Sequence, residues 1–356
     1  MKKMSLLAVV FFFLCFNNIS AKEYPSIYKG IRPMGMGGAF VAVSNDSNAL
    51  FYNPAGLADI TERRVSLLNL GVEFGRKAYN TIKDARGVDF EDESETAGFL
   101  RDHIGEYSHV GANLVPFYSR PNFAFALIGT TSVNLQARNR QYPKLVIDAV
   151  GDAGAAIGYA HAFLDNTLLV GASGKFITRK SLDKEYSVLD ITTDDFNDKI
   201  DNDTEDGIGG LLDLGLIYLL KDIQISTKNV DFRFGISAAN LGNNDMGDAK
   251  NIDDHIDLGF AANIDNWMFA LDYVDVFTQM NVGDEDATKR IRIGAEYAFK
   301  PYLLFRFGFY QGYTTFGIGL NKKNVQFDLL SYAEEVAAYS GQRSDRRYAL
   351  RLGLGF

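Results

Sequence analysis

The chain of 356 residues is 47% hydrophobic and 13% aromatic, contains one cysteine and one tryptophan, and has a formal net charge of −9. Loss of Lys2 and Lys3 with an export signal would bring the charge to −11 (−9 − 2), and the acidic residues crowd into polar segments, which argues against nucleic-acid binding. Beyond the first residues, no stretch approaches the roughly 18 uninterrupted apolar residues that a membrane-spanning helix needs.

Residues 1–21 have the layout of a secretory signal peptide. Lys2 and Lys3 precede an apolar run over 6–16, and small residues lead up to Ala21, after which we expect cleavage. Cys15 lies inside the apolar run, so the mature chain would contain no cysteine. That excludes disulfides, thiolate metal sites and cysteine nucleophiles.

A glycine-rich segment over residues 30–57 follows and ends in a turn motif. Glycine permits tight turns and close backbone approach, and an Asn-Pro-Ala-Gly turn favours one rigid loop. We interpret residues 22–60 as a plug and 61–356 as a barrel. The residues predicted to form the plug and gating motif are Gly35, Gly37, Gly38, Asn53, Pro54, Ala55 and Gly56. Those that would line a ligand channel, or else pack the plug against the wall, are Met34, Met36, Phe40, Phe51 and Tyr52.

The remaining chain alternates apolar and polar residues in segments of strand length, as in Leu303, Phe305, Phe307 and Phe309. Alternation alone does not separate a soluble sandwich from a membrane barrel. The expected strands number fourteen, and they are 64–74, 108–119, 122–137, 145–163, 167–181, 207–220, 229–240, 254–264, 266–278, 289–300, 302–312, 314–321, 324–334 and 345–356. The predicted fold is all-β, a 14-stranded antiparallel transmembrane β-barrel with the N-terminal plug inside its lumen.

The connections mostly alternate between long polar loops and tight links, which is the asymmetry of outer-membrane barrels. The long set is 75–107, 138–144, 182–206, 241–253, 279–288 and 335–344, and the tight set is 120–121, 164–166, 265, 301 and 322–323. The 221–228 link is a little longer, and the tight 311–313 link is an exception because it should face outward. Helical spacing of Phe99, Ile104 and Tyr107 predicts a helix in the first loop.

The chain resembles a known family at its plug and, more loosely, at its C-terminus. A glycine-rich N-terminal hatch that ends in NPAGL before outer-membrane strands is similar to the FadL- and TodX-like outer-membrane transporters, and the end RRYALRLGLGF reads like their PorV-type branch. The resemblance implies a fourteen-stranded barrel around an N-terminal plug. The terminal Phe356 looks like the signal that the outer-membrane assembly machinery reads.

Charged residues on the polar faces of the strands should point into the lumen. They are Lys175, Asp213, Asp231, Arg233, Asp257, Asp272, Arg292, Glu296, Arg306 and Arg351. Both signs are present, so a network of ion pairs that fixes the plug is one interpretation. The other is that Arg292, Arg306 or Arg351 holds the anionic head group of a ligand.

Other sites have weaker sequence support. The acidic run 201–206, with carboxylates from Asp201 to Asp206, is either a solvated outer loop or a calcium site, although Gly207 comes one residue late for an EF-hand. The four histidines are dispersed and no nucleophile elbow is present, so we predict no enzyme activity, cofactor or metal, with a hidden lipid hydrolase as the alternative. Pro116 either opens a lateral gap in the wall or marks an ordinary strand end.

The leading functional hypothesis is passive uptake of a hydrophobic compound across the cell outer membrane, and long-chain fatty acids are the substrate class that the resemblance implies. The compound would enter near the outer loops, pass beside the plug and leave when Asn53 to Gly56 and their neighbours shift. The alternative is a PorV-like docking or shuttle component of protein export, whose loops bind export-system proteins. Both place the chain among outer-membrane lipid and lipopolysaccharide, with no nucleic acid as partner.

Overall fold

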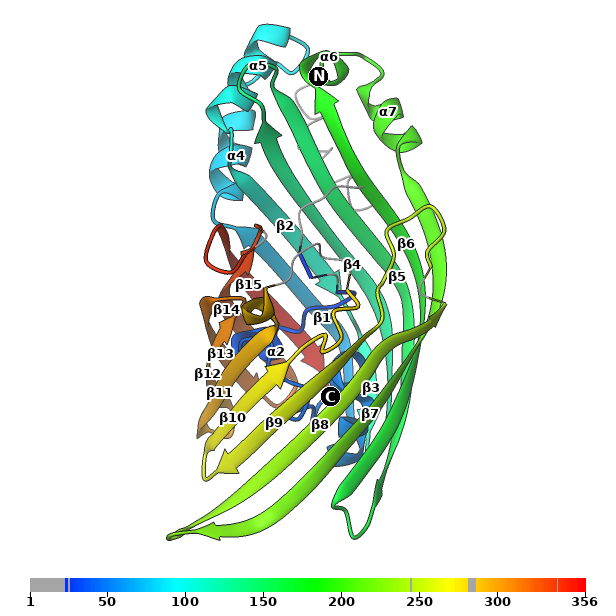
Figure 1. The fold of residues 1–356 in the computed structure, drawn as a ribbon, viewed down its shortest axis with the longest axis vertical. Helices are drawn as coiled ribbons and strands as arrows, with labels where there is room; N and C mark the ends of the chain where they lie inside the picture. The colour runs from blue at the N-terminus through cyan, green and yellow to red at the C-terminus, as the bar shows by residue number, and fades with distance from the viewer. Residues whose placement is uncertain (1–22, 25, 244, 281–285, 338) are drawn as a thin grey trace.

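The strands of the computed structural model form one closed antiparallel sheet (Figure 1). The structure describes residues 23–24, 26–243, 245–280, 286–337 and 339–356, so the predicted signal peptide lies outside the described residues. Strand β15 pairs with β1 and closes the ring. Both β2 and β3 pair with β1 and β4, so these two segments are one interrupted strand. The fifteen segments therefore make a fourteen-stranded barrel (15 − 1), as predicted.

The strand bounds follow the alternating segments of the sequence closely. They are β1 Arg64–Gly75, β2 Tyr107–Leu114, β3 Phe117–Arg120, β4 Phe123–Arg138, β5 Lys144–Phe163, β6 Leu168–Ser187, β7 Glu205–Ile225, β8 Lys228–Asn243, β9 His255–Ile264, β10 Trp267–Tyr273, β11 Ile291–Lys300, β12 Leu303–Tyr310, β13 Tyr313–Lys322, β14 Val325–Glu335 and β15 Ser344–Gly355. The helices are α2 Ile31–Gly35, α3 Ala49–Tyr52, η1 Pro54–Asp59, α4 Ala78–Ala85, α5 Glu93–Asp102, α6 Val188–Ile191, α7 Phe196–Asn202 and η2 Ala287–Arg290.

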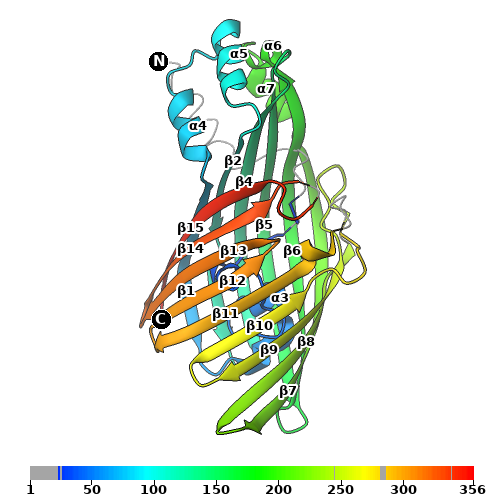
Figure 2. The same cartoon turned by 60° about the vertical axis from the view of Figure 1, so that its left-hand side comes forward.

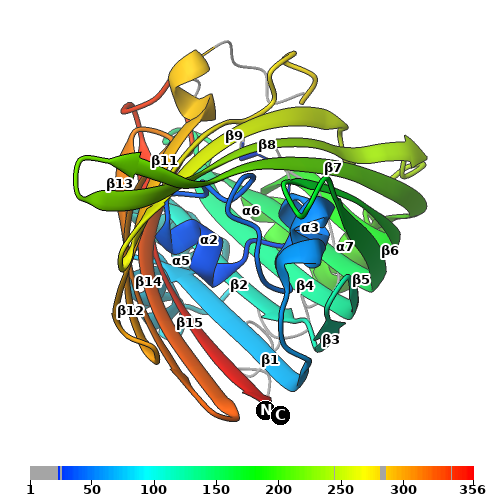
Figure 3. The same ribbon diagram turned by 90° about the horizontal axis from the view of Figure 1, so that it is seen from below.

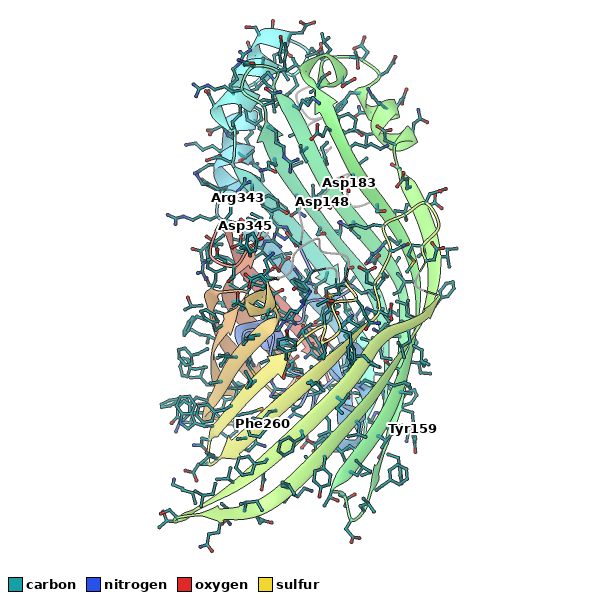
Figure 4. All side chains as sticks on the ribbon, viewed as in Figure 1. Asp148, Tyr159, Asp183, Phe260, Arg343 and Asp345 are labelled. Atoms are coloured by element: carbon teal, nitrogen blue, oxygen red, sulfur yellow. The ribbon has the colours of Figure 1, made fainter. Side chains whose placement is uncertain are left out.

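The barrel has an apolar outside and a polar inside. On β12, Phe307 faces outward and is 44% exposed, whereas its neighbour Arg306 faces the lumen and is 1% exposed. Figure 4 labels the same contrast on β5, where Tyr159 is exposed and Asp148 is buried. A soluble sandwich has the opposite distribution, because its large apolar face is the inner one. An apolar outer surface around a polar lumen is that of a membrane-spanning barrel.

Two predicted segments of the wall differ from the observed elements. The 221–228 link is shorter than expected, because β7 and β8 extend to Ile225 and Lys228 with a bulge between Leu220 and Ile223. Strand β10 ends at Tyr273 instead of residue 278, since Asp275 adopts a positive φ of 53° and accepts the amide hydrogens of Gln279 and Met280.

The helices of the outer loops also differ from the prediction. The helix expected around Phe99 ends at Asp102, and Tyr107 already belongs to β2. The loop predicted over 182–206 contains the end of β6 and two short helices, α6 and α7. Side chains alternate along β6, so Leu182 and Tyr186 should point out of the barrel, as the exposed Phe176 does. They are nevertheless buried in an apolar cluster with the helices. The helices therefore cover apolar surface where β4–β6 rise above the other strands (Figure 1).

A capping box holds the first of these helices in place. The Ser187 hydroxyl accepts the amide hydrogen of Asp190, and the Asp190 carboxylate accepts that of Ser187. Burial raises the pKa of Asp190, but the hydrogen bonds from Lys199 and Ser187 together with the charge of Lys199 outweigh it and lower the pKa to about 2. The cap is therefore ionised at neutral pH.

Candidate functional site

The N-terminal segment, residues 23–60, lies inside the barrel. Seen from below, α2 and α3 occupy the middle of the ring of strands (Figure 3). We call this segment the plug. The described part of the plug is largely buried, and Met36, Phe40 and Leu50 are fully inaccessible to solvent.

Two glycines of the plug are required by close approach to neighbouring backbone. Gly37 has φ of +64° and lies against the backbone of Ile293 and Phe309, where a Cβ would overlap both strands. Gly56 faces the carbonyl of Ser44, and a Cβ there would overlap its oxygen. Gly35 ends α2 beside Arg306, and Gly38 lies beside Arg292. The glycine-rich segment is thus packed directly against β11–β13.

The Asn53-Pro54-Ala55-Gly56 turn is anchored from several directions. The Asn53 Nδ2 donates to the carbonyl oxygens of Val41 at 2.9 Å, Ile236 at 3.2 Å and Leu216 at 3.3 Å. Its Oδ1 accepts the amide hydrogen of Ala55 at 3.1 Å and caps η1, whose first residue is Pro54. One side chain therefore joins two parts of the plug to strands β7 and β8.

Replacement of Asn53 by alanine should loosen this turn. Asn53→Ala removes the N-cap and the bonds to three buried carbonyls, at a cost of about 2 kcal/mol in local opening free energy. Hydrogen exchange of the amides in residues 40–57 measures that opening. Asn266→Ala, in an exposed turn, is the control, and equal protection of residues 40–57 in both variants would contradict the anchoring role.

Polar side chains from β8–β13 hold the plug on one side. The Asp272 Oδ2 accepts the amide hydrogens of Phe40 at 2.6 Å and Val41 at 2.8 Å. The Thr315 hydroxyl donates to the Gly35 carbonyl at 3.0 Å. The Arg233 guanidinium donates to the Ala42 carbonyl at 2.7 Å and pairs with Asp59. On this side the plug is attached to the wall by hydrogen bonds.

Apolar contacts dominate on the side of β3–β6. There the plug residues Ile27, Leu50 and Leu57 share a buried cluster with wall side chains. The wall members from β3 to β6 and the short link before β3 are Val115, Phe117, Ala124, Ala126, Ile128, Ala156, Ala160 and Ile177. We call this contact the apolar seam. Among the described residues, two hydrogen bonds join plug and wall at this contact. The Asn122 amide donates to the Leu57 carbonyl, and the Ser173 hydroxyl donates to the Leu50 carbonyl.

The break at Pro116 lies in the middle of a strand beside this seam, and the strand resumes at Phe117. Asn69 of β1 spans the break, because its carbonyl accepts the Val115 amide hydrogen and its Nδ2 donates to the Val115 carbonyl, both at 3.0 Å. The Pro116 carbonyl accepts the amide hydrogen of Leu127 at 3.0 Å. The wall is therefore closed at this point by hydrogen bonds, one of which comes from a side chain.

Three of the predicted inward charges belong to one chain of ion pairs. Arg32 of the plug pairs with Glu296 at 2.7 Å, and Arg306 pairs with Glu296 at 2.7 Å and with Asp328 at 2.6 Å. Arg351 pairs with Asp328 at 2.6 Å. Arg306 and Arg351 are thus both paired with buried carboxylates, although the Nη2 of Arg306 has no hydrogen-bond partner among the described residues.

The other inward residues are placed separately. Lys175 pairs with Asp213 at 2.5 Å, and Asp257 lies 3.5 Å from His255. Asp231 is half-buried near the lower rim, where it accepts the amide hydrogen of Asp222. Arg292 differs from the other lumen arginines, since in the described part of the chain it has no carboxylate partner.

Arg292 lies over an aromatic ring at the edge of a cavity. Its guanidinium carbon is 5.1 Å from the centre of the Tyr310 ring, and its buried Nε has no hydrogen-bond partner among the described residues. The cavity has a volume of about 80 Å³. Its lining combines polar groups with the side chains of Ile27, Met34 and Phe51. In the described part of the chain, a cation without a carboxylate partner thus shares a partly open cavity with apolar side chains.

A second cavity of about 110 Å³ lies on the other side of the first plug residues. It is lined mainly by polar groups, among them Glu73, His109, Asp148 and Arg179. Both cavities are bounded by the same segment, which contains Tyr24, Ser26, Ile27, Tyr28 and Lys29. Glu23 and Lys29 tie this segment to the wall through Arg347 and Glu334.

The predicted lining residues separate into two groups. Met34, Phe51 and Tyr52 border the cavity at Arg292. Met36 and Phe40 instead pack against Ala261 and Ala270 of the wall. The lining also includes residues that the sequence did not single out, His255, Val274 and Met280. His255 begins β9, whereas Val274 and Met280 follow β10, and the three share no motif, so no local signal could have identified them.

The acidic run 201–206 is engaged by neighbouring side chains. Asp203 accepts a hydrogen bond from the Tyr186 hydroxyl and lies 3.9 Å from Lys184. Among the described residues, no group of three or more histidine, cysteine or acidic side chains has the arrangement of a metal site. In the same part of the chain, no helix is long and apolar enough to cross a bilayer.

Comparison with known proteins finds similarity only among solved structures, since no family model and no curated protein matches the chain. The CymD monoaromatic hydrocarbon channel has a TM-score of 0.48 at 13% identity, covering 93% of this chain and 98% of CymD. The Pseudomonas putida toluene transporter TodX has a TM-score of 0.47 at 12% identity, covering 94% and 99%. Outer membrane phospholipase A from Escherichia coli reaches 0.36 at 10% identity, covering 58% and 78%.

Proposed function

We propose that this barrel transfers a hydrophobic compound with an anionic head group passively across the cell outer membrane, and that long-chain fatty acids belong to its substrate class. The observation that carries this proposal is the cavity at Arg292. Among the described residues, Arg292 has no carboxylate partner there and shares the cavity with apolar side chains, which suits a ligand that is charged at one end and apolar at the other.

Arg292 is the best candidate among the three lumen arginines considered from the sequence. Arg306 and Arg351 share Asp328, and Arg306 also pairs with Glu296. A ligand carboxylate would have to compete with these buried ion pairs. Asp257 also borders the cavity, but it faces His255 and accepts the Asp275 amide hydrogen.

The compound must pass the plug, since a cavity of about 80 Å³ is too small for a long acyl chain. The segment from Tyr24 to Lys29 separates the two cavities, and its displacement would join them. The apolar seam beside Pro116 would let an acyl chain move between plug and wall among apolar side chains. The Asn53 turn is anchored so firmly that we assign the movement to the first plug residues instead.

Arg292→Gln should selectively weaken retention of an acidic ligand. We expect a loss of about tenfold or more in affinity for dodecanoic acid, since a charge-assisted hydrogen bond is lost, and no change for dodecanol. Native mass spectrometry of the detergent-solubilised barrel measures both. Arg76→Gln is the matched control, because Arg76 is exposed. Equal loss for acid and alcohol, or no binding of either by the wild type, would contradict the proposal.

A docking role in protein export is the second candidate, and the ion-paired lumen favours it. The chain of charges from Arg32 to Arg351 fills the inside, while Tyr79, Tyr142 and Leu189 are 70%, 76% and 62% exposed on the outer loops. Such side chains suit a protein contact. Absence of any retained ligand, together with loss of a co-purifying protein in Tyr142→Ser, would favour docking over transfer.

A further inference from the structure

The barrel wall differs in height around its circumference. Strands β10 and β12 have 7 and 8 residues, whereas β5 and β6 have 20 each and β7 has 21. Figure 2 shows β10–β15 as a low stack of strongly tilted strands, with β4–β6 rising beside them. A transmembrane strand usually needs about 9–11 residues, so β10 and β12 are short for this task.

The outward apolar stripe is correspondingly short on β10–β15. On β12 it runs from Leu303 to Phe309 and on β10 from Trp267 to Tyr273, six residue steps in each case (309 − 303 and 273 − 267). On β15 it runs from Tyr348 to Phe356, which is eight steps (356 − 348). At about 3.4 Å per residue and a tilt of about 35–45°, six steps cover roughly 15 Å of membrane thickness. The apolar band of an outer-membrane barrel is normally about 25 Å tall.

Charged side chains mark the upper limit of this stripe where β1 pairs with β15, a contact that we call the closing seam. Phe74 of β1 and Tyr348 of β15 pair across the seam, and their ring centres are 6.1 Å apart. By alternation Arg76 and Arg346 are the next outward positions, and the Arg76 amide donates to the Arg346 carbonyl. Two adjacent arginines at that height require water or lipid head groups.

The opposite face has a stripe of ordinary height. On β7 the outward apolar series runs from Ile208 through Leu214 to Leu220, which is twelve steps (220 − 208). With the same rise per residue and the same tilt, twelve steps cover roughly 30 Å of membrane thickness. The two faces also differ in side-chain type, because leucine dominates on β7 while aromatic residues dominate on β10–β13. The aromatic set that is more than a third exposed is Trp267, Phe269, Phe299, Tyr302, Phe307, Phe309 and Phe316.

We propose that β10–β15 with β1 form a bilayer-thinning face, to which lipids with short acyl chains bind in preference to long ones. A bilayer whose hydrocarbon thickness equals the height of the apolar stripe on β7 would immerse Arg76 and Arg346 in hydrocarbon on the other side of the same barrel. Local thinning avoids this, and the mismatch cost selects shorter chains there. Aromatic rings suit such a face, since they reside well at the interface between head groups and hydrocarbon. This inference is independent of what the lumen transports.

The single tryptophan of the chain provides the probe, because Trp267 lies on the outer surface of β10 and is 38% exposed. The purified barrel is reconstituted in mixtures of brominated and plain phosphatidylcholines with acyl chains of 14 and 18 carbons. Competitive quenching of tryptophan fluorescence then gives relative lipid affinities. We expect the 14-carbon lipid to bind about threefold or more tightly at Trp267.

A matched pair of variants separates the two faces. In a Trp267→Phe background, Phe307→Trp reports on the middle of the thinning face and Leu214→Trp on β7, and both positions are exposed. We expect the short-chain preference at residue 307 and none at 214. Equal preference at both positions overturns the proposal. The proposal is also overturned if brominated lipid quenches the tryptophan at position 214 but not the tryptophans at 267 and 307. Protein, not lipid, would then cover the proposed thinning face.

Discussion

Gly56→Val is expected to open the barrel to ions while leaving its wall intact. Any Cβ at residue 56 overlaps the Ser44 carbonyl oxygen, so the turn and the preceding plug segment cannot keep their contact. Overpacking of this kind typically costs 1–3 kcal/mol, and backbone on the other side leaves little room for relaxation. Steady conductance in a planar bilayer should rise by an order of magnitude or more over wild type.

The control for this experiment is another glycine of the barrel. A Cβ at Gly174 of β6 meets nothing within 4 Å, so Gly174→Val should insert normally and conduct like wild type. Heat-modifiable migration on gels verifies that both variants have folded. If the folded Gly56→Val barrel conducted no more ions than wild type, the idea that this turn keeps the plug in its blocking position would be refuted.

Arg306→Met is expected to cause the largest loss of stability. The Arg306 guanidinium bonds Glu296 at 2.7 Å and Asp328 at 2.6 Å and is 1% exposed. Its removal leaves two buried carboxylates with one arginine each, and breaking a buried ion pair typically costs about 3–5 kcal/mol. Urea unfolding in detergent micelles measures the free energy of unfolding.

Arg140→Met is the comparison for this variant, since Arg140 is exposed in the loop after β4. We expect a change within about 0.5 kcal/mol there. If Arg306→Met lost less than 1 kcal/mol, the charge chain would contribute little to the barrel, and its inward position would have to serve another purpose.

The sequence predicts the wall well because two different surroundings act on every strand. Lipid outside and charged lumen inside impose a period of two, so segments such as Leu303 to Phe309 are visible without neighbours. Boundaries fail where a single side chain decides, as at Asp275, whose carboxylate ends β10 early. The break at Pro116 was visible as a proline, but its closure by Asn69 depends on pairing with β1.

The candidate site depends on pairing between strands, which the sequence does not contain. Arg292, Arg306 and Arg351 occupy equivalent positions in their strand patterns. The register places Asp328 opposite Arg351, within reach of Arg306 as well, and Arg292 opposite Tyr310. Only this arrangement separates Arg292, which has no carboxylate partner in the part of the chain that the structure describes, from the two arginines that are ion-paired. The difference is one of tertiary neighbours, not of residue type.

The closing seam has a consequence for the order of assembly. The last residue, Phe356, exchanges backbone hydrogen bonds with Val65, so the wall is complete only when both ends of the barrel sequence have met. These partners are separated by almost the whole chain, and such distant pairings form slowly. The plug precedes Val65 in the chain and crowds the finished lumen. A chain stalled before β1 and β15 join would present two unpaired sheet edges to the membrane.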